Sequence, residues 1–255
     1  RLQRAGINLW SAGALAISAL VLTPILSVAW LALSPGEGIW GHLAATTLPR
    51  YLSNSLILML SVGAITATVG TAAAWLVTQY RFPGARWLEW VLLLPLAIPA
   101  YIGAYAVTDL LDYAGPVQTL LRGLFGWQSA RDYWFPEIRS RWAAVVVLSA
   151  ALYPYCYLLA RAAFREQSVC AHEVARTLGA GAWRRFFAIA LPLARPAIAA
   201  GTAVAMMETA ADFGVVDFFA VQTLTTGIFT TWLQAANAAG AAQIAGVVLI
   251  LVFGL

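Results

Sequence analysis

Two long stretches without a charged side chain constrain this sequence more than any other feature. Residues 5–36 and 51–80 are uncharged over 32 and 30 residues. About 20 apolar residues are enough for a helix to cross the hydrocarbon core of a bilayer, and the apolar core of a secretory signal is much shorter. The two stretches therefore predict membrane-spanning helices, at about Asn8–Leu33 and Tyr51–Tyr80.

The composition is that of a membrane protein and excludes the main soluble classes. Of the 255 residues, 62% are hydrophobic and 10% are charged, whereas soluble domains carry about 25% charged residues. A disulfide scaffold is excluded because Cys156 and Cys170 are the only cysteines. The formal net charge of +4 does not indicate a nucleic-acid partner, because the arginines lie between apolar runs and form no stripe.

Four further apolar segments complete an expected all-α, polytopic bundle of about six transmembrane helices. A third span is predicted at 87–108 and should be bent by Pro95 and Pro99, because each proline removes an amide donor. The remaining spans are expected at 142–160, at 197–219 and from about residue 241. Small residues at 63–74 within the second span predict a close approach of neighbouring helices.

The segment 161–196 is a charged loop between the fourth and fifth spans. It should form short helices, broken at Gly179 to Gly181 and stopped near Pro192 and Pro196. Because cytoplasmic loops collect positive residues, the arginine count favours a cytoplasmic N-terminus and a cytoplasmic 161–196 loop. In this orientation both cysteines should be free thiols. The inner side holds Arg1, Arg4, Arg81, Arg86, Arg161, Arg165, Arg176, Arg184, Arg185 and Arg195, and the outer side holds Arg50, Arg122, Arg131, Arg139 and Arg141.

The loop carries a spaced motif. Residues 173–178 can form a short helix, Gly179 permits the positive φ that ends it, and residues 183–189 form a second amphipathic piece. The chemistry leaves two alternatives of equal weight: docking into a partner's groove, or an interfacial helix on anionic lipid. The motif positions are Glu173, Ala175, Gly179, Ile189, Leu191 and Pro192.

This spacing resembles the EAA loop of permease subunits in bacterial binding-protein-dependent ABC importers. That pattern is Glu-Ala-Ala, three residues, Gly, nine residues, Ile, one residue and Leu-Pro; here Val174 replaces the middle alanine. The resemblance implies a type I ABC importer permease fold. It implies further that 173–178 is a coupling helix in a cleft of an ATPase subunit, where Glu173 meets a basic residue. Leu191-Pro192 would begin the fifth span.

Other segments are similar to the ferric-iron branch of these permeases, although relatives for sulfate, thiamine, phosphonates or polyamines share the architecture. The similar segments are 95–101, 133–139, 208–214 and 222–228. The resemblance implies a cytoplasmic ATPase dimer, a periplasmic binding protein and a second permease half as partners. Because that branch commonly joins two halves in one chain, residues 1–255 are expected to be a single transmembrane domain and the N-terminal half of a longer permease.

Three acids in the fifth apolar segment are candidates for the translocation path. Glu208 and Asp212 are four residues apart, and so on one face of a continuous helix, about 16 and 22 Å deep at ~1.5 Å per residue. Asp217 would lie near ~30 Å, on another face. Such acids face protein or water. The pair could pass a hydrated cation, or could be hydrogen-bonded and fix helix packing; both alternatives stay open.

The sequence predicts no catalysis by this chain. His172-Glu173 begins like a zinc-protease motif, but Arg176 stands where the second histidine would be. The sequence contains no lysine, so a Walker A site is impossible and ATP must be bound by a separate subunit. We expect no metal or cofactor on this chain, which would be a transport subunit of the bacterial inner membrane. The rival is an ion-coupled secondary transporter using Glu208 and Asp212.

Overall fold

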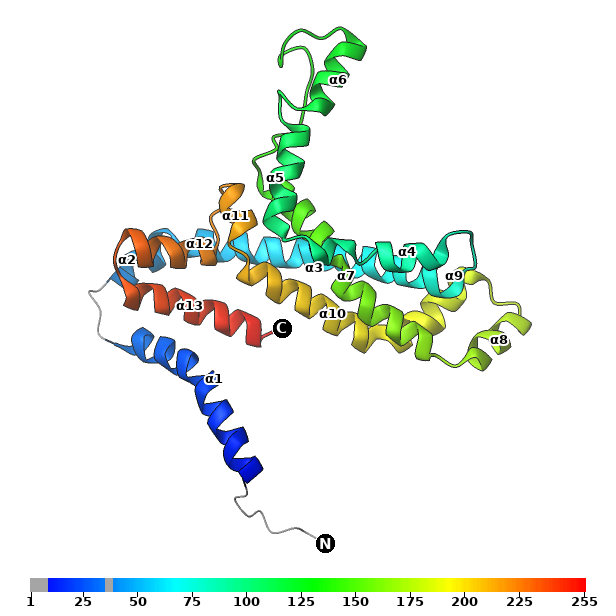
Figure 1. Ribbon diagram of the computed structural model, residues 1–255, viewed down its shortest axis with the longest axis horizontal. Coiled ribbons are helices and arrows are strands. Elements are labelled where there is room, and N and C mark those ends of the chain that lie inside the picture. Colours follow the sequence, from blue (N-terminus) through cyan, green and yellow to red (C-terminus); the bar gives the residue numbers. More distant parts are fainter. Residues whose placement is uncertain (1–8, 35–38) are drawn as a thin grey trace. The chain divides into compact units, whose positions relative to one another are not determined.

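The computed structural model describes residues 9–34 and 39–255, and its described part contains helices and no strand (Figure 1). Arg1, Arg4 and the expected first helical residue, Asn8, lie outside the described residues. The chain divides into two compact units, residues 1–49 with 224–255, and residues 50–223. Each is described by itself.

The smaller unit pairs the first and last apolar helices. Helix α1 (Leu9–Leu33) packs along α13 (Ala238–Phe253), and Gln243 Nε2 donates to the Ala32 carbonyl at 3.2 Å. Asn237 begins α13 by accepting a hydrogen bond from the Gly240 amide at 2.7 Å, which satisfies a donor that the helix itself leaves free. The unit also contains α2 (Ile39–Thr46), α12 (Leu224–Phe229) and a π-turn at Thr230–Gln234.

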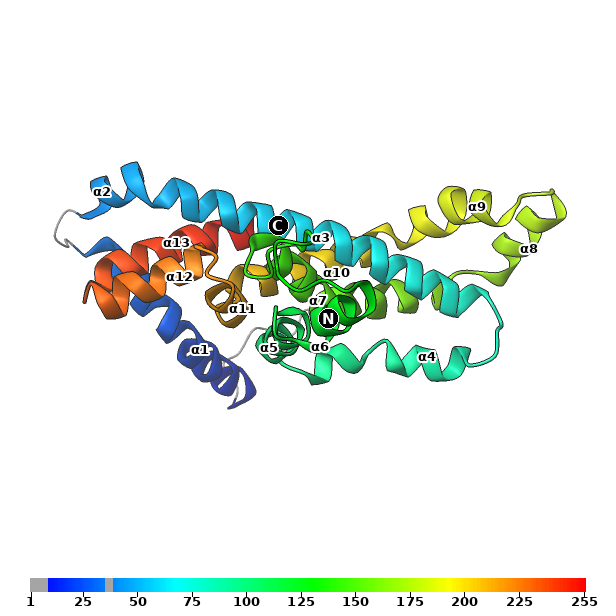
Figure 2. The same cartoon turned by 90° about the horizontal axis from the view of Figure 1, so that it is seen from above.

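Three long helices form the centre of the larger unit: α3 (Leu48–Gln79), α7 (Arg141–Glu166) and α10 (Leu191–Ala211) (Figure 2). Glycines bring their backbones together at Cys156 of α7. A Cβ on Gly70 of α3 would lie 2.9 Å from Cys156 Cβ, and one on Gly201 of α10 would lie 2.7 Å from Cys156 Cα. The small-residue stretch of the second span therefore does place helices in close contact, as predicted. Cys156 is a buried free thiol.

The third predicted span is broken. It consists of α4 (Ala85–Val91), a 3₁₀ turn (Leu94–Ala97) and α5 (Ala100–Leu111), which α6 (Pro116–Phe125) follows. The segments 85–97 and 100–125 are bent by 96°. The break falls at Ile98, whose extended φ of −113° and ψ of 121° suit a residue that precedes proline. The expected bend is confirmed and is sharper than a simple kink.

The region around the fifth span departs from expectation at both ends. After α8 (Val169–Thr177), one continuous helix runs from Ala182 to Ala211 as α9 (Ala182–Arg185), a π-turn (Phe186–Ala190) and α10. The prediction that helices stop near Pro192 and Pro196 is wrong. Pro192 comes directly after the π-turn, a bulge of the kind that interrupts the hydrogen-bond ladder of a helix, and Pro196 lies inside the helix.

The helix also ends eight residues before the predicted Phe219. Asp212 is extended, with ψ 132°, and a separate short helix follows, α11 (Gly214–Phe218). Four helices of the described part are long and apolar enough to cross a membrane, or five if the bent pair is one span, and α13 is a shorter apolar helix. This agrees with the predicted all-α bundle.

Candidate functional sites

Helix α8 projects as a separate element beyond the long helices and ends as the sequence predicts (Figure 1). Gly179 has φ 78°, its amide donates to the Arg176 carbonyl at 3.0 Å, and the Ala180 amide donates to the Ala175 carbonyl at 2.9 Å. These two bonds form a Schellman motif, whose left-handed residue is most easily glycine. Ala175 is buried, whereas Glu173 is exposed. The motif glycine therefore sets the direction in which the chain leaves α8.

The loop exposes large apolar side chains. Leu178 and Trp183 are 81% and 76% exposed, and Val174 and Phe187 are also exposed. The rings of Trp183 and Phe187 are stacked with centroids 6.0 Å apart. Exposed apolar groups gathered on one projection indicate a surface for a partner or for lipid.

The base of the loop is held firmly. Ala190 is buried, and Ile189, Leu191 and Pro192 are half-buried where the loop joins α10. Gln167 Nε2 donates to the Ala190 carbonyl at 2.9 Å, and Trp75 of α3 contacts the Phe186 ring with centroids 5.1 Å apart. The second half of the motif thus belongs to the same continuous helix as α10, so displacement of the loop would be transmitted to that helix.

A carboxylate near this base joins α4 to α7. Glu89 of α4 makes ion pairs with Arg161 and Arg165 of α7. The Tyr157 hydroxyl donates to the Glu89 carbonyl at 3.1 Å, and the Tyr153 hydroxyl donates to the Leu92 carbonyl at 2.8 Å. Sequence reasoning missed this cluster; a lone acid in an apolar segment, with two arginines four residues apart in a later one, is the signal that could have found it.

Glu208 and Asp212 line the same cavity, though with a different geometry from the one predicted. Asp212 lies beyond the end of α10, so the two do not share a face of one helix. Its Oδ1 accepts hydrogen bonds from the Val215 and Val216 amides at 3.0 and 3.2 Å, which begin α11. Both acids line a cavity of about 240 Å³ together with Tyr155 and the broken third span.

Asp217 lies elsewhere. It is exposed on α11 and does not line the cavity of Glu208 and Asp212. Among the described residues, no group of three or more His, Cys, Asp and Glu side chains is placed to hold a metal ion. The cavity therefore offers two carboxyl groups and one phenol, a set suited to transient contact with a passing solute more than to permanent metal binding.

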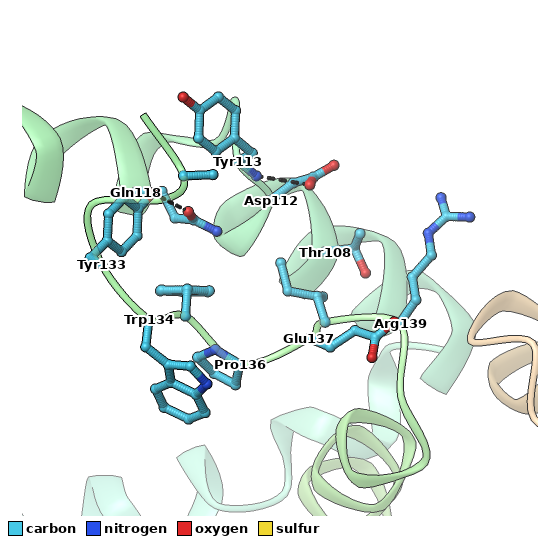
Figure 3. Close-up of a pocket in the computed structure, with 12 residues that line it drawn as sticks. Thr108, Asp112, Tyr113, Gln118, Tyr133, Trp134, Pro136, Glu137 and Arg139 are labelled. Carbon is cyan, nitrogen blue, oxygen red and sulfur yellow. Dashed lines mark hydrogen bonds between the residues drawn. The ribbon is translucent and has the colours of Figure 1, made fainter. Parts of the chain in front are cut away.

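At the far end of α7, the segment 109–141 is folded. The Tyr133 hydroxyl donates to Gln118 Oε1, and the rings of Trp127 and Tyr133 stack at 4.7 Å. Backbone amides of Ser129 and Gln128 donate to the Asp132 carboxyl and lower its pKa. A cavity of about 520 Å³ opens among these elements, with Gln118, Tyr133 and Trp134 on its wall (Figure 3).

Comparison with known proteins places these features in context. Residues 67–255 match the family described as "Binding-protein-dependent transport system inner membrane component". The molybdenum transport system permease protein ModB of Escherichia coli is 30% identical over 182 residues, which cover 69% of this chain and 76% of that protein. The Fe(3+)-transport system permease protein FbpB 2 of Haemophilus influenzae is 26% identical over 207 residues, covering 80% of this chain and 36% of that protein.

The fold also has a solved counterpart. A chain in the crystal structure of a bacterial alginate ABC transporter, in complex with alginate pentasaccharide-bound periplasmic protein, superposes with a TM-score of 0.73. The alignment covers 96% of this chain and 92% of that chain at 17% identity. This likeness concerns the fold alone.

Proposed function

The chain belongs to the family of binding-protein-dependent transport system inner membrane components, and on this premise we propose how it couples ATP hydrolysis on a partner to the import of Fe(III). It is a permease subunit of an ABC importer, a transport component of the inner membrane and not an enzyme.

We place α8 in a cleft of a cytoplasmic ABC ATPase dimer, which binds the ATP. The observation that carries this proposal is the exposed apolar group Val174, Leu178, Trp183 and Phe187 on a projecting loop with a rigid base. A protein groove would bury these side chains, and exposed Glu173 would meet a basic residue there. Because the helix is continuous from Ala182 to Ala211, closure of the ATPase dimer would move α10 with the loop.

The remaining partners follow from this orientation. With the 161–196 loop in the cytoplasm, the N-terminus is cytoplasmic and the 109–141 segment faces the periplasm. The folded aromatic structure around Tyr133 then offers a preformed surface to the periplasmic binding protein. A second permease half, fused or separate, completes the pathway, since two such subunits are needed to enclose it.

Fe(III) is the proposed cargo. Hard oxygen ligands suit this ion, and the cavity of Glu208, Asp212 and Tyr155 supplies such oxygens beside the broken third span. The Fe(3+)-transport relative, aligned over 80% of this chain, supports the choice. A second candidate is a small oxyanion, favoured by the molybdenum permease relative at 30% identity.

Reconstitution tests the proposal. The permease, its ATPase and the binding protein are assembled in proteoliposomes, and uptake of radiolabelled iron is compared with uptake of radiolabelled molybdate. We expect iron uptake that requires ATP and the binding protein. If molybdate were taken up and iron were not, the cargo assigned to the permease would change, but its assignment as an importer would stand. Uptake that follows an ion gradient and ignores ATP would contradict the coupling mechanism and favour a secondary transporter.

A further inference from the structure

A third cavity, lined by polar side chains, lies at the N-terminal end of α7, remote from the loop that carries α8. Its volume is about 320 Å³. It lies where α7 begins at Arg141, beside the turn that follows α11 and the first part of α3. Its lining residues are Asn54, Arg139, Ser140, Arg141, Trp142 and the segment 219–222.

Two arginines, Arg139 and Arg141, line this cavity, a third, Arg50, bonds to the lining residue Gln222, and none of the described lining residues is acidic. Arg141 Nη1 donates to Asn54 Oδ1 at 3.1 Å, and Arg50 Nη1 donates to Gln222 Oε1 at 3.4 Å. Asn54 and Gln222 are themselves joined, because Asn54 Nδ2 donates to the Gln222 carbonyl at 2.8 Å. The guanidinium groups of Arg141 and Arg50 are therefore hydrogen-bonded to the same pair of neutral amide side chains, Asn54 and Gln222. Within the described part of the chain, no acidic side chain lies within 4 Å of either group or of Arg139.

One of these guanidinium groups carries a buried donor that nothing satisfies. Arg141 Nε is buried and has no hydrogen-bond partner among the described residues. A buried cationic donor is costly unless it is paired, and an unsatisfied one in a native structure calls for a ligand, water or ion. The guanidinium of Arg139 lies 5.7 Å from the Phe218 ring centroid, a contact that leaves its donors free to bind a ligand.

We propose that this cavity binds a compact oxyanion, such as phosphate or sulfate, held by Arg141 and Arg139, with Arg50 adding positive charge beside the lining residue Gln222. Arginine presents several donors in a planar fork that matches the oxygens of such anions. The positive end of α7, a helix of 26 residues, adds to the same potential. The anion could come from solution or be the phosphate of a lipid headgroup. The site does not depend on the cargo, so it and the proposed function can fail separately.

Equilibrium binding tests the site in the assembled permease–ATPase complex with saturating ADP, which fills the phosphate-binding loops of the ATPase. The complex is placed in nanodiscs of phosphatidylcholine and titrated with radiolabelled sulfate or phosphate. We expect saturable binding of one anion per site, weakened roughly tenfold or more by Arg141→Gln and by Arg139→Gln. The matched control is Arg131→Gln, which removes an exposed arginine of the same segment that does not line the cavity; it should leave the affinity unchanged.

The variants also separate the possible sources of the anion. Arg139 is exposed, and folding depends on no hydrogen bond that it makes in the described structure. Arg139→Gln therefore keeps the test valid if Arg141→Gln misfolds. If native mass spectrometry finds an anionic phospholipid that is lost in the arginine variants, the same chemistry holds with a lipid source. Arginine-independent binding, or no binding of either anion or phospholipid, overturns the proposal.

Discussion

The two ends of α7 carry arginines in opposite electrostatic settings. Near the C-terminal end, Arg161 and Arg165 share the carboxylate of Glu89. Arg141 at the N-terminal end, roughly 30 Å away at about 1.5 Å per residue, donates to the neutral amide of Asn54 and has no acidic partner among the described residues. The first cluster has an acidic partner within the protein, which offsets one of its two positive charges and ties α4 to α7. The second keeps its charge available, so the difference separates a structural ion pair from a site prepared for a ligand.

Both ends depend on the packing of α7 against α10. The largest expected effect is therefore from Gly201→Leu, whose Cβ alone would lie 2.7 Å from Cys156 Cα. Overpacking of this kind costs about 1–3 kcal/mol, and more where backbone atoms collide. We expect loss of monodisperse protein in fluorescence-detected size-exclusion chromatography. Gly246→Leu on α13 is the control, because a Cβ there meets no atom within 4 Å; equal damage by both would contradict the account.

Glu89→Gln removes the charge that pairs the C-terminal cluster. Glu89 is 13% exposed in its side chain and Arg165 is 56% exposed. Losing one partner of a buried pair costs about 3 kcal/mol, whereas an exposed pair contributes about 0–1 kcal/mol. The melting temperature should fall clearly for Glu89→Gln and only slightly for Arg165→Gln. If Arg165→Gln were the more damaging change, the cluster would not depend on Glu89.

Two helix ends share a left-handed residue, which is glycine at one end and alanine at the other, so opposite substitutions can be compared. Gly179, after α8, and Ala220, after α11, both have positive φ, at 78° and 55°. The Ala220 and Val221 amides donate to the Asp217 and Val216 carbonyls at 2.9 and 2.8 Å, the same Schellman pattern as at Gly179.

A left-handed alanine costs roughly 1 kcal/mol relative to glycine. Thus Ala220→Gly should raise the melting temperature, while Gly179→Ala should lower it slightly and reduce ATP-driven uptake, because the direction of the chain leaving α8 changes. Chemical denaturation and transport assays measure the two effects. If Ala220→Gly lowered stability, the left-handed turn could not be a source of strain.

The smallest effect on stability is expected at the unpaired end. Arg139→Gln removes an exposed charge without breaking an ion pair, so the free energy of unfolding should change by no more than about 0.5 kcal/mol. Thermal melting with and without sulfate provides the measurement. A loss as large as that of Glu89→Gln would mean that the two arginine clusters are alike.

The spans and the α8 motif could be predicted from sequence because both depend on local patterns. Long runs without charged residues predict helices α1, α3 and α7. Gly179 predicts the end of α8 because glycine adopts positive φ easily. The prediction that helices stop near Pro192 and Pro196 failed because the folded protein tolerates a proline inside a helix, as at Pro196 of α10.

The tertiary pairings were beyond local patterns. Asp212 accepts hydrogen bonds from amides of α11, which the sequence pattern did not distinguish from α10. Glu89 pairs with arginines of a helix more than seventy residues later in the chain. Nothing local specifies such meetings, because they depend on how the broken third span folds back on α7.

Cysteine accessibility and crosslinking at α8 test whether this helix lies in the cytoplasm and docks on the ATPase. Leu178→Cys is placed in a chain with Cys156 and Cys170 replaced by serine, with Trp134→Cys at the other end of α7 as the control. We expect residue 178 to crosslink to the ATPase, with a yield that changes when ATP binds. We expect only residue 134 to react with a membrane-impermeant thiol reagent added from outside. Labelling of residue 178 from outside, or its failure to reach the ATPase in the assembled importer, would contradict the claim.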